Sequence, residues 1–154
     1  MNFKIKYIFW LNLFFILACQ QKETLFSKLN YNKDISKILI IVYNNDNTCI
    51  SCNLALQNFF LDIRTNQNFT NGIVTVLKAV REKEKGKIEK QLIEFGVHSK
   101  FIYDNNLFNE LSQYFSDVPS AGGFIVLDNK DNLLFELSFK SPYFSEKIQS
   151  IFDK

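Results

Sequence analysis

Histidine, methionine and tryptophan each occur once in this 154-residue sequence, proline occurs twice, cysteine three times and glycine five times. Because proline and glycine are the residues that most often mark sharp turns, each of these few positions carries information. Hydrophobic residues make up 47% of the chain and charged residues 22%. That balance excludes a wholly disordered, collagen-like or coiled-coil chain. The length fits a single domain of about 150 residues.

An excess of charge of either sign is also missing. The chain has 18 Lys and Arg against 16 Asp and Glu, and two of the lysines, Lys4 and Lys6, lie in a segment that we expect to be removed. The remaining balance is 16 − 16 = 0. Proteins that bind nucleic acids typically present a strongly basic face. We therefore expect no nucleic-acid partner.

Residues 1–18 have the pattern of a secretory signal. A short basic segment, 1–6, precedes a mostly apolar stretch over 7–18, as in signal peptides. This stretch is shorter than the roughly 20 residues that a membrane-spanning helix needs. Ala18 and Cys19 at its end resemble a bacterial lipobox, in which the cysteine receives diacylglycerol and becomes the new N-terminus. We expect lipidation at Cys19; an ordinary cleaved signal peptide or an uncleaved anchor are the alternatives.

Lipidation leaves Cys49 and Cys52 as the remaining thiols of the mature chain. It also predicts a place in the bacterial cell envelope, anchored to a membrane and facing the periplasm or the exterior, where disulfides persist. The predicted organisation is a signal peptide over 1–18, a tether over 19–35 with room for one short element, and one domain over 36–154.

The order of apolar segments predicts an α/β fold. Strands are expected at 37–43, 73–80, 100–103, 123–128 and 133–139, and helices at 49–64, 82–95, 105–115 and 142–152. Strands separated by helices imply parallel pairing, while the last two strands are joined by a short Asn/Asp turn and form an antiparallel hairpin. The sheet is therefore expected to be mixed.

Cys49 and Cys52 lie where the first predicted strand gives way to a helix. The first turn of a helix presents unpaired N–H groups and the positive end of the helix dipole. A thiolate is stabilised there, so the pKa of Cys49 should fall below that of a free thiol. The three-residue spacing brings Cys52 onto the same helical face. Cys49 is the predicted nucleophile, and Cys52 the thiol that resolves a mixed disulfide.

The CxxC segment at 49–52, followed by Val118-Pro119 and then a hairpin, resembles the thioredoxin-fold proteins, and most closely the TlpA-like extracytoplasmic thiol–disulfide oxidoreductases. The strand–Asp–helix pattern that starts at Phe101 is similar to an insertion found in that family. The resemblance covers roughly residues 36–154. It implies a three-layer thioredoxin-like fold, with a mixed central sheet flanked by helices.

The resemblance also implies roles for two further residues. Pro119 would be cis and would lie beside the dithiol, where its ring keeps metal away. The backbone of Val118 would pair with an extended substrate chain. The expected partners are envelope proteins with thiols or disulfides and a membrane or periplasmic electron donor, with no cofactor and no bound metal. The chain departs from most relatives by having Thr48 where they have Trp.

Three other functions would use the same residues. A structural zinc site needs four ligands, more than the two thiols and His98 can supply, and we expect His98 to be a surface residue. A thioredoxin-fold copper chaperone is a closer alternative, although those proteins usually have three residues between their cysteines and this chain has two. The other alternative is a non-catalytic binding lipoprotein with a structural disulfide, for which so short a loop adds little stability.

Overall fold

Strands and helices alternate along the chain. The computed structural model describes residues 24–29, 31, 35–44, 54, 56–60, 72–115, 122–141 and 144–148. The labelled elements are α2 (Leu25–Lys28), β1 (Lys37–Tyr43), β2 (Ile73–Leu77), α4 (Glu82–Glu94), β3 (Lys100–Tyr103), α5 (Asn105–Ser112), β4 (Gly123–Asp128), β5 (Leu133–Ser138) and α6 (Phe144–Ile148). Residues 54 and 56–60 are also helical. The predicted bounds of β1, β3 and β4 are confirmed.

The five strands form one mixed sheet in the order β3-β2-β1-β4-β5. β1 is parallel to β2, and β2 is parallel to β3. β4 runs antiparallel to both β1 and β5. β1 is therefore the central strand, with a hydrogen-bonded neighbour on each side.

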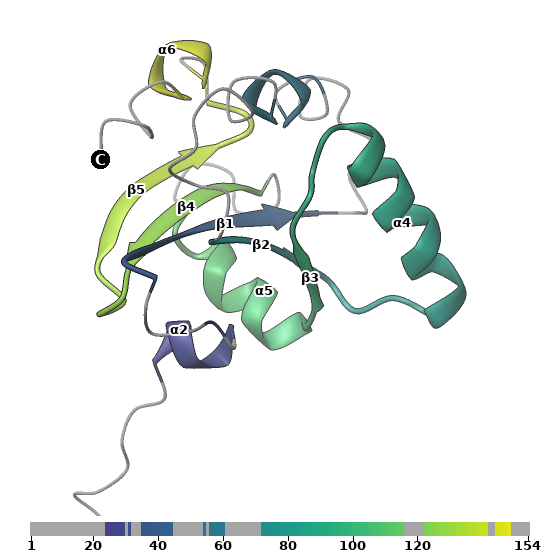
Figure 1. Ribbon diagram of the computed structural model, residues 1–154, viewed down its shortest axis with the longest axis horizontal. Helices are drawn as coiled ribbons and strands as arrows, with labels where there is room; N and C mark the ends of the chain where they lie inside the picture. Colours follow the sequence, from purple (N-terminus) through teal and green to yellow (C-terminus); the bar gives the residue numbers. More distant parts are fainter. Residues whose placement is uncertain are drawn as a thin grey trace, which may run out of the picture.

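Alternate residues of β1 point to opposite faces of the sheet, and both faces are covered. One face, with Ile38, Ile40 and Val42, packs against α2 and α5. The other, with Leu39, Ile41 and Tyr43, packs against α4, α6 and the helical residues 56–60. Figure 1 shows α2 and α5 on one side of the sheet and α4 and α6 on the other. A strand covered on both faces reads as an unbroken apolar run. The predicted α/β three-layer architecture is confirmed.

β2 ends at Leu77, three residues earlier than predicted. The carbonyl oxygen of Leu77 accepts a hydrogen bond from the backbone N–H of Asp104. Two residues later the N–H of Ala79 donates to Oδ1 of Asn105 at 3.0 Å. The chain beyond Leu77 thus bonds to the start of α5 rather than to β3, so the apolar run over-estimates the strand.

The apolar spacing in the sequence predicts that Leu54 and Ile93 belong to the buried stripes of their helices, but both are exposed. Leu54 is 54% exposed and Ile93 is 44% exposed. In the first helix, Leu56, Phe59 and Phe60 form the buried face, and a residue two positions before Leu56 lies well off that face at 100° per residue. The predictions for Leu54 and Ile93 were therefore wrong. α4 ends at Glu94, one residue before the predicted bound. Gly96 follows at a φ of 90°, which suits a glycine after a helix C-terminus.

The short element expected within the predicted tether is α2. Its residue Leu25 and the following Leu29 are buried against the face of the sheet that α5 covers. Within the ranges that the structure describes, no helix has the length and apolar character needed to cross a membrane.

Asp104 caps α5, and its removal should destabilise the domain. Its carboxylate accepts hydrogen bonds from the N–H groups of Asn106 at 2.8 Å and Leu107 at 2.9 Å. We expect Asp104→Ala to lower the free energy of unfolding by about 1 kcal/mol, because two N-terminal donors lose their acceptor. Asp104→Asn keeps an acceptor oxygen and should lose clearly less. Urea denaturation measures both, and equal losses in the two variants would contradict this role.

Candidate functional site

The predicted site residues lie outside the described residues. This holds for Cys49 and Cys52, for Val118 and Pro119, and for Cys19. The structure does describe the residues that adjoin the two central segments. Asn44 and Leu54 adjoin the CxxC segment, and Phe115 and Gly122 adjoin the proline segment.

The chain enters the CxxC segment from the C-terminal end of β1. Tyr43 and Asn44 at this end are each only 7% exposed. Burial raises the pKa of Tyr43 above its ordinary value, so the phenol is neutral at pH 7. This end of the central strand therefore presents uncharged, largely buried groups.

The chain leaves the CxxC segment in a helix that is packed on the sheet. Phe59 is fully buried, and its ring lies 4.1 Å from that of Phe124 in β4, centroid to centroid. Phe60 meets Phe59 edge to face at 5.3 Å. Aromatic contacts of this kind stabilise beyond their buried area. The helical residues after Cys52 are thus held against β4, close to where β4 pairs with β1.

Gly122, the first described residue after the proline segment, lies at the same end of the sheet. Gly123, the first residue of β4, pairs with Val42 near the end of β1. Gly122 has a φ of 72°, and a Cβ added to it would overlap the carbonyl oxygen of Val42. Gly122, which comes three residues after Pro119 in the sequence, therefore enters the sheet directly beside the end of β1.

No role was predicted for Gly122 from the sequence. The available signal was a pair of adjacent glycines in a chain that has five in all. Gly123 is equally restricted, because a Cβ there would overlap the carbonyl oxygen of Leu137 in β5. Backbone approach this close admits no side chain.

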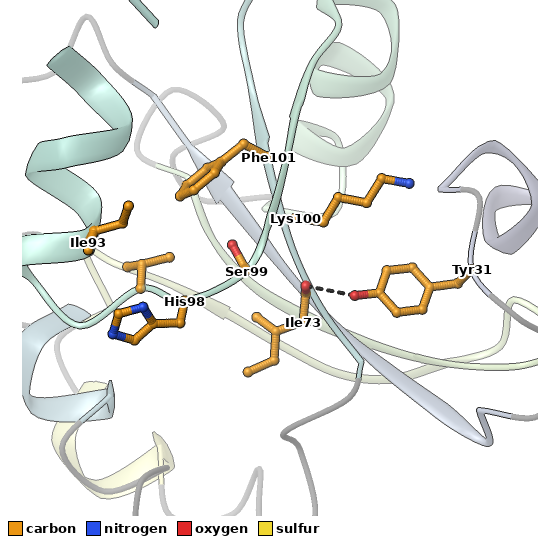
Figure 2. A pocket seen from close by; sticks show the side chains of 8 residues that line it. Tyr31, Ile73, Ile93, His98, Ser99, Lys100 and Phe101 are labelled. Carbon is orange, nitrogen blue, oxygen red and sulfur yellow. Dashed lines mark hydrogen bonds between the residues drawn. The ribbon is translucent and has the colours of Figure 1, made fainter. Parts of the chain in front are cut away.

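A groove lies at the opposite end of the sheet (Figure 2). It has a volume of about 440 Å³ and is lined by Tyr31, Ile73, Ile93, Val97, His98, Ser99, Lys100 and Phe101. Ile73 and Lys100 begin β2 and β3, which are parallel to β1. The groove is therefore at the start of the parallel strands, whereas the CxxC segment follows the end of β1.

The polar groups of this groove are largely occupied by structural hydrogen bonds. The hydroxyl of Tyr31 donates to the carbonyl oxygen of Ile73 at 2.9 Å (Figure 2). The hydroxyl of Ser99 bonds to that of Thr75 at 2.6 Å. His98 is exposed, as predicted. In the described part of the chain no group of three or more His, Cys, Asp or Glu side chains gathers as metal ligands would.

Comparison with known proteins bears on the fold. No protein-family model matches the chain, and no curated protein matches it. A solved structure described as "Solution Structure of a Thioredoxin-like Protein in the Oxidized Form" superposes with a TM-score of 0.52. The two chains are 16% identical, and the match covers 80% of this chain and 84% of the other. This likeness, with the mixed sheet described above, shows that the chain has a thioredoxin-like fold.

Replacing Gly122 should weaken the joint between β1 and β4. We expect Gly122→Ala to lower the free energy of unfolding by about 2 kcal/mol or more, because it combines an unfavourable positive φ with overlap against Val42. Gly86→Ala is the matched control, since Gly86 lies in α4 with open space around it. It should raise stability by about 0.5–1 kcal/mol. Denaturant unfolding of both variants tests this, and an unchanged Gly122→Ala midpoint would contradict it.

Proposed function

We propose that the chain is an extracytoplasmic thiol–disulfide oxidoreductase, lipid-anchored at Cys19, which acts on envelope protein disulfides through Cys49 and Cys52. The observation that carries the proposal is the pairing of Val42 with Gly123 in a thioredoxin-like sheet. Because of this register, the described neighbours of the CxxC segment and of the Val118–Pro119 segment adjoin one end of the sheet. The resemblance to the TlpA-like proteins supports the finer assignment.

The proposed reaction is a pair of thiol–disulfide exchanges. The Cys49 thiolate attacks one sulfur of a client disulfide, which forms a mixed disulfide and releases the other client sulfur as a thiolate. The Cys52 thiolate then attacks the Cys49 sulfur and releases the second client sulfur. Two electrons pass to the client, and a Cys49–Cys52 disulfide is left. A membrane or periplasmic dithiol donor reduces that disulfide by the same steps, and the reverse sequence oxidises a client dithiol.

The segment around Pro119 would serve this reaction by binding the client. In the proposal, the backbone of Val118 pairs with an extended client chain, as a strand adds to an open sheet position. Gly122 supports this role, because it lets the incoming chain run close against the end of β1.

Reduction of insulin disulfides tests the proposed activity. The soluble chain from Gln20 onward should catalyse insulin reduction by dithiothreitol, and Cys49→Ser should abolish the catalysis because the attacking sulfur is gone. Cys52→Ser should leave mixed disulfides unresolved, so turnover stops after the first step. Serine replaces cysteine in both variants because its side chain is close to that of cysteine in size.

The same soluble chain distinguishes the proposed oxidoreductase from a copper chaperone and from a binding lipoprotein. Stoichiometric Cu(I) binding by the reduced chain, with no insulin reduction, would overturn the proposal in favour of a copper chaperone. A disulfide that resists dithiothreitol, with neither activity, would leave a binding lipoprotein with a structural disulfide.

A further inference from the structure

A short segment at the start of the domain is fixed to one end of the sheet. We call its described residues, 24–29 and 31, the strap. The backbone N–H of Leu25 donates to Oδ2 of Asp131, in the turn between β4 and β5, at 2.6 Å. Nζ of Lys28 lies 2.8 Å from a carboxylate oxygen of Glu110 in α5. The first half of the strap is thus held by two different elements.

The second half is held by the starts of β2 and β3. The Tyr31 hydroxyl donates to the carbonyl oxygen of Ile73 at 2.9 Å, and Nζ of Lys100 donates to the carbonyl oxygen of Leu29 at 3.1 Å. Leu29 is fully buried. Polar contacts at both ends around a buried leucine distinguish the strap from a flexible linker.

All these contacts lie at the end of the sheet where β1 begins. Lys37, the first residue of β1, pairs with Asp128, which precedes the turn containing Asp131. Figure 1 shows α2 and the β4–β5 turn at the start of β1, away from its arrowhead. In the sequence, the CxxC segment follows the other end of β1. The strap and the end of β1 that leads to Cys49 are therefore at opposite ends of the sheet.

We propose that the strap end of the domain faces the lipid surface and that the end bearing Cys49 points away from it. The inference rests on the proposed lipid anchor at Cys19. Leu25 lies only six residues after Cys19 in the sequence (25 − 19 = 6), a reach of at most roughly 20 Å. β1 alone spans about 20 Å from Lys37 to Tyr43. Turning the other end to the lipid would stretch the whole tether along the side of the sheet.

This orientation restricts which proteins can exchange disulfides with Cys49, according to how far their cysteines lie from the membrane. A partner must present its cysteines on the aqueous side, at least the length of β1, about 20 Å, beyond the strap. That requirement fits soluble envelope proteins and projecting domains. It disfavours a partner whose cysteines lie at the surface of the membrane that holds the anchor.

Energy transfer to the membrane tests the orientation. The full lipoprotein, carrying Cys49→Ser and Cys52→Ser, receives one new thiol for a donor fluorophore. Lys130→Cys places it in the β4–β5 turn, and Ala79→Cys places it beyond the C-terminal end of β2; both residues are exposed. Vesicles of phosphatidylethanolamine and phosphatidylglycerol carry a headgroup-labelled acceptor.

Transfer from the Lys130→Cys label should be several-fold more efficient than transfer from the Ala79→Cys label. Adding Asp131→Gly and Tyr31→Phe, which remove two strap contacts, should bring the two efficiencies together. Glycine suits the φ of 63° at Asp131. Equal efficiencies without these strap substitutions, or greater transfer from the Ala79→Cys label, would overturn the orientation. Circular dichroism verifies that each variant is folded.

Failure of this inference can be told apart from failure of the proposed function. Mass spectrometry of the vesicle-bound chain reports whether Cys19 carries acyl groups, and absence of the lipid would overturn both the anchor and the orientation. Insulin reduction by the chain with Cys49 and Cys52 intact reports the redox activity alone. A lipidated, redox-active chain with equal transfer efficiencies would refute the orientation and leave the proposed function standing.

Discussion

The central strand β1 is hydrogen-bonded to a parallel neighbour on one side and an antiparallel neighbour on the other, and both its faces are buried. The parallel pairing makes β1 and β2 end together, while the antiparallel pairing makes β4 begin where β1 ends. Close contact between Gly122 and Val42 is the tightest point of this arrangement. The candidate site and the placement of the strap both depend on this strand pairing, because its register sets which loops adjoin one another at each end of the sheet.

The polar groups at the two ends of the sheet have different surroundings. At the start of β1, the side chains of Tyr31, Lys100 and Asp131 are occupied in holding the strap. The groove there lies between β3, α4 and the strap, and the side chains of Tyr31, Ser99 and Lys100 that line it are hydrogen-bonded within the protein. At the opposite end, Tyr43 and Asn44 are uncharged and largely buried. A fixed attachment at one end suits the proposed arrangement, in which the client approaches the other end from solution.

Much of the fold could be predicted from the sequence, for identifiable physical reasons. The apolar β-branched run at 37–43 is what a strand buried on both faces requires, and Gly96 marks a helix end. The ends of strands and helices were harder to predict where hydrogen bonds between distant residues determine them, as the bond between Leu77 and Asp104 does at the end of β2. The packing of α2 could not be predicted, because Leu25 and Leu29 in a polar segment do not reveal that a distant Asp131 supplies the partner. Cys49, Cys52, Val118 and Pro119 lie outside the described residues, so their roles stay predictions.

The central claim is that a thiolate at Cys49 is stabilised where the chain passes from β1 into a helix. Alkylation rates of the reduced Cys52→Ser chain, measured across pH, report the pKa of Cys49 directly, and Cys49→Ser provides the matched measurement on Cys52. The account predicts a pKa for Cys49 below the ordinary thiol value of about 8.5 and below that of Cys52. A Cys49 pKa at or above about 8.5 would contradict it.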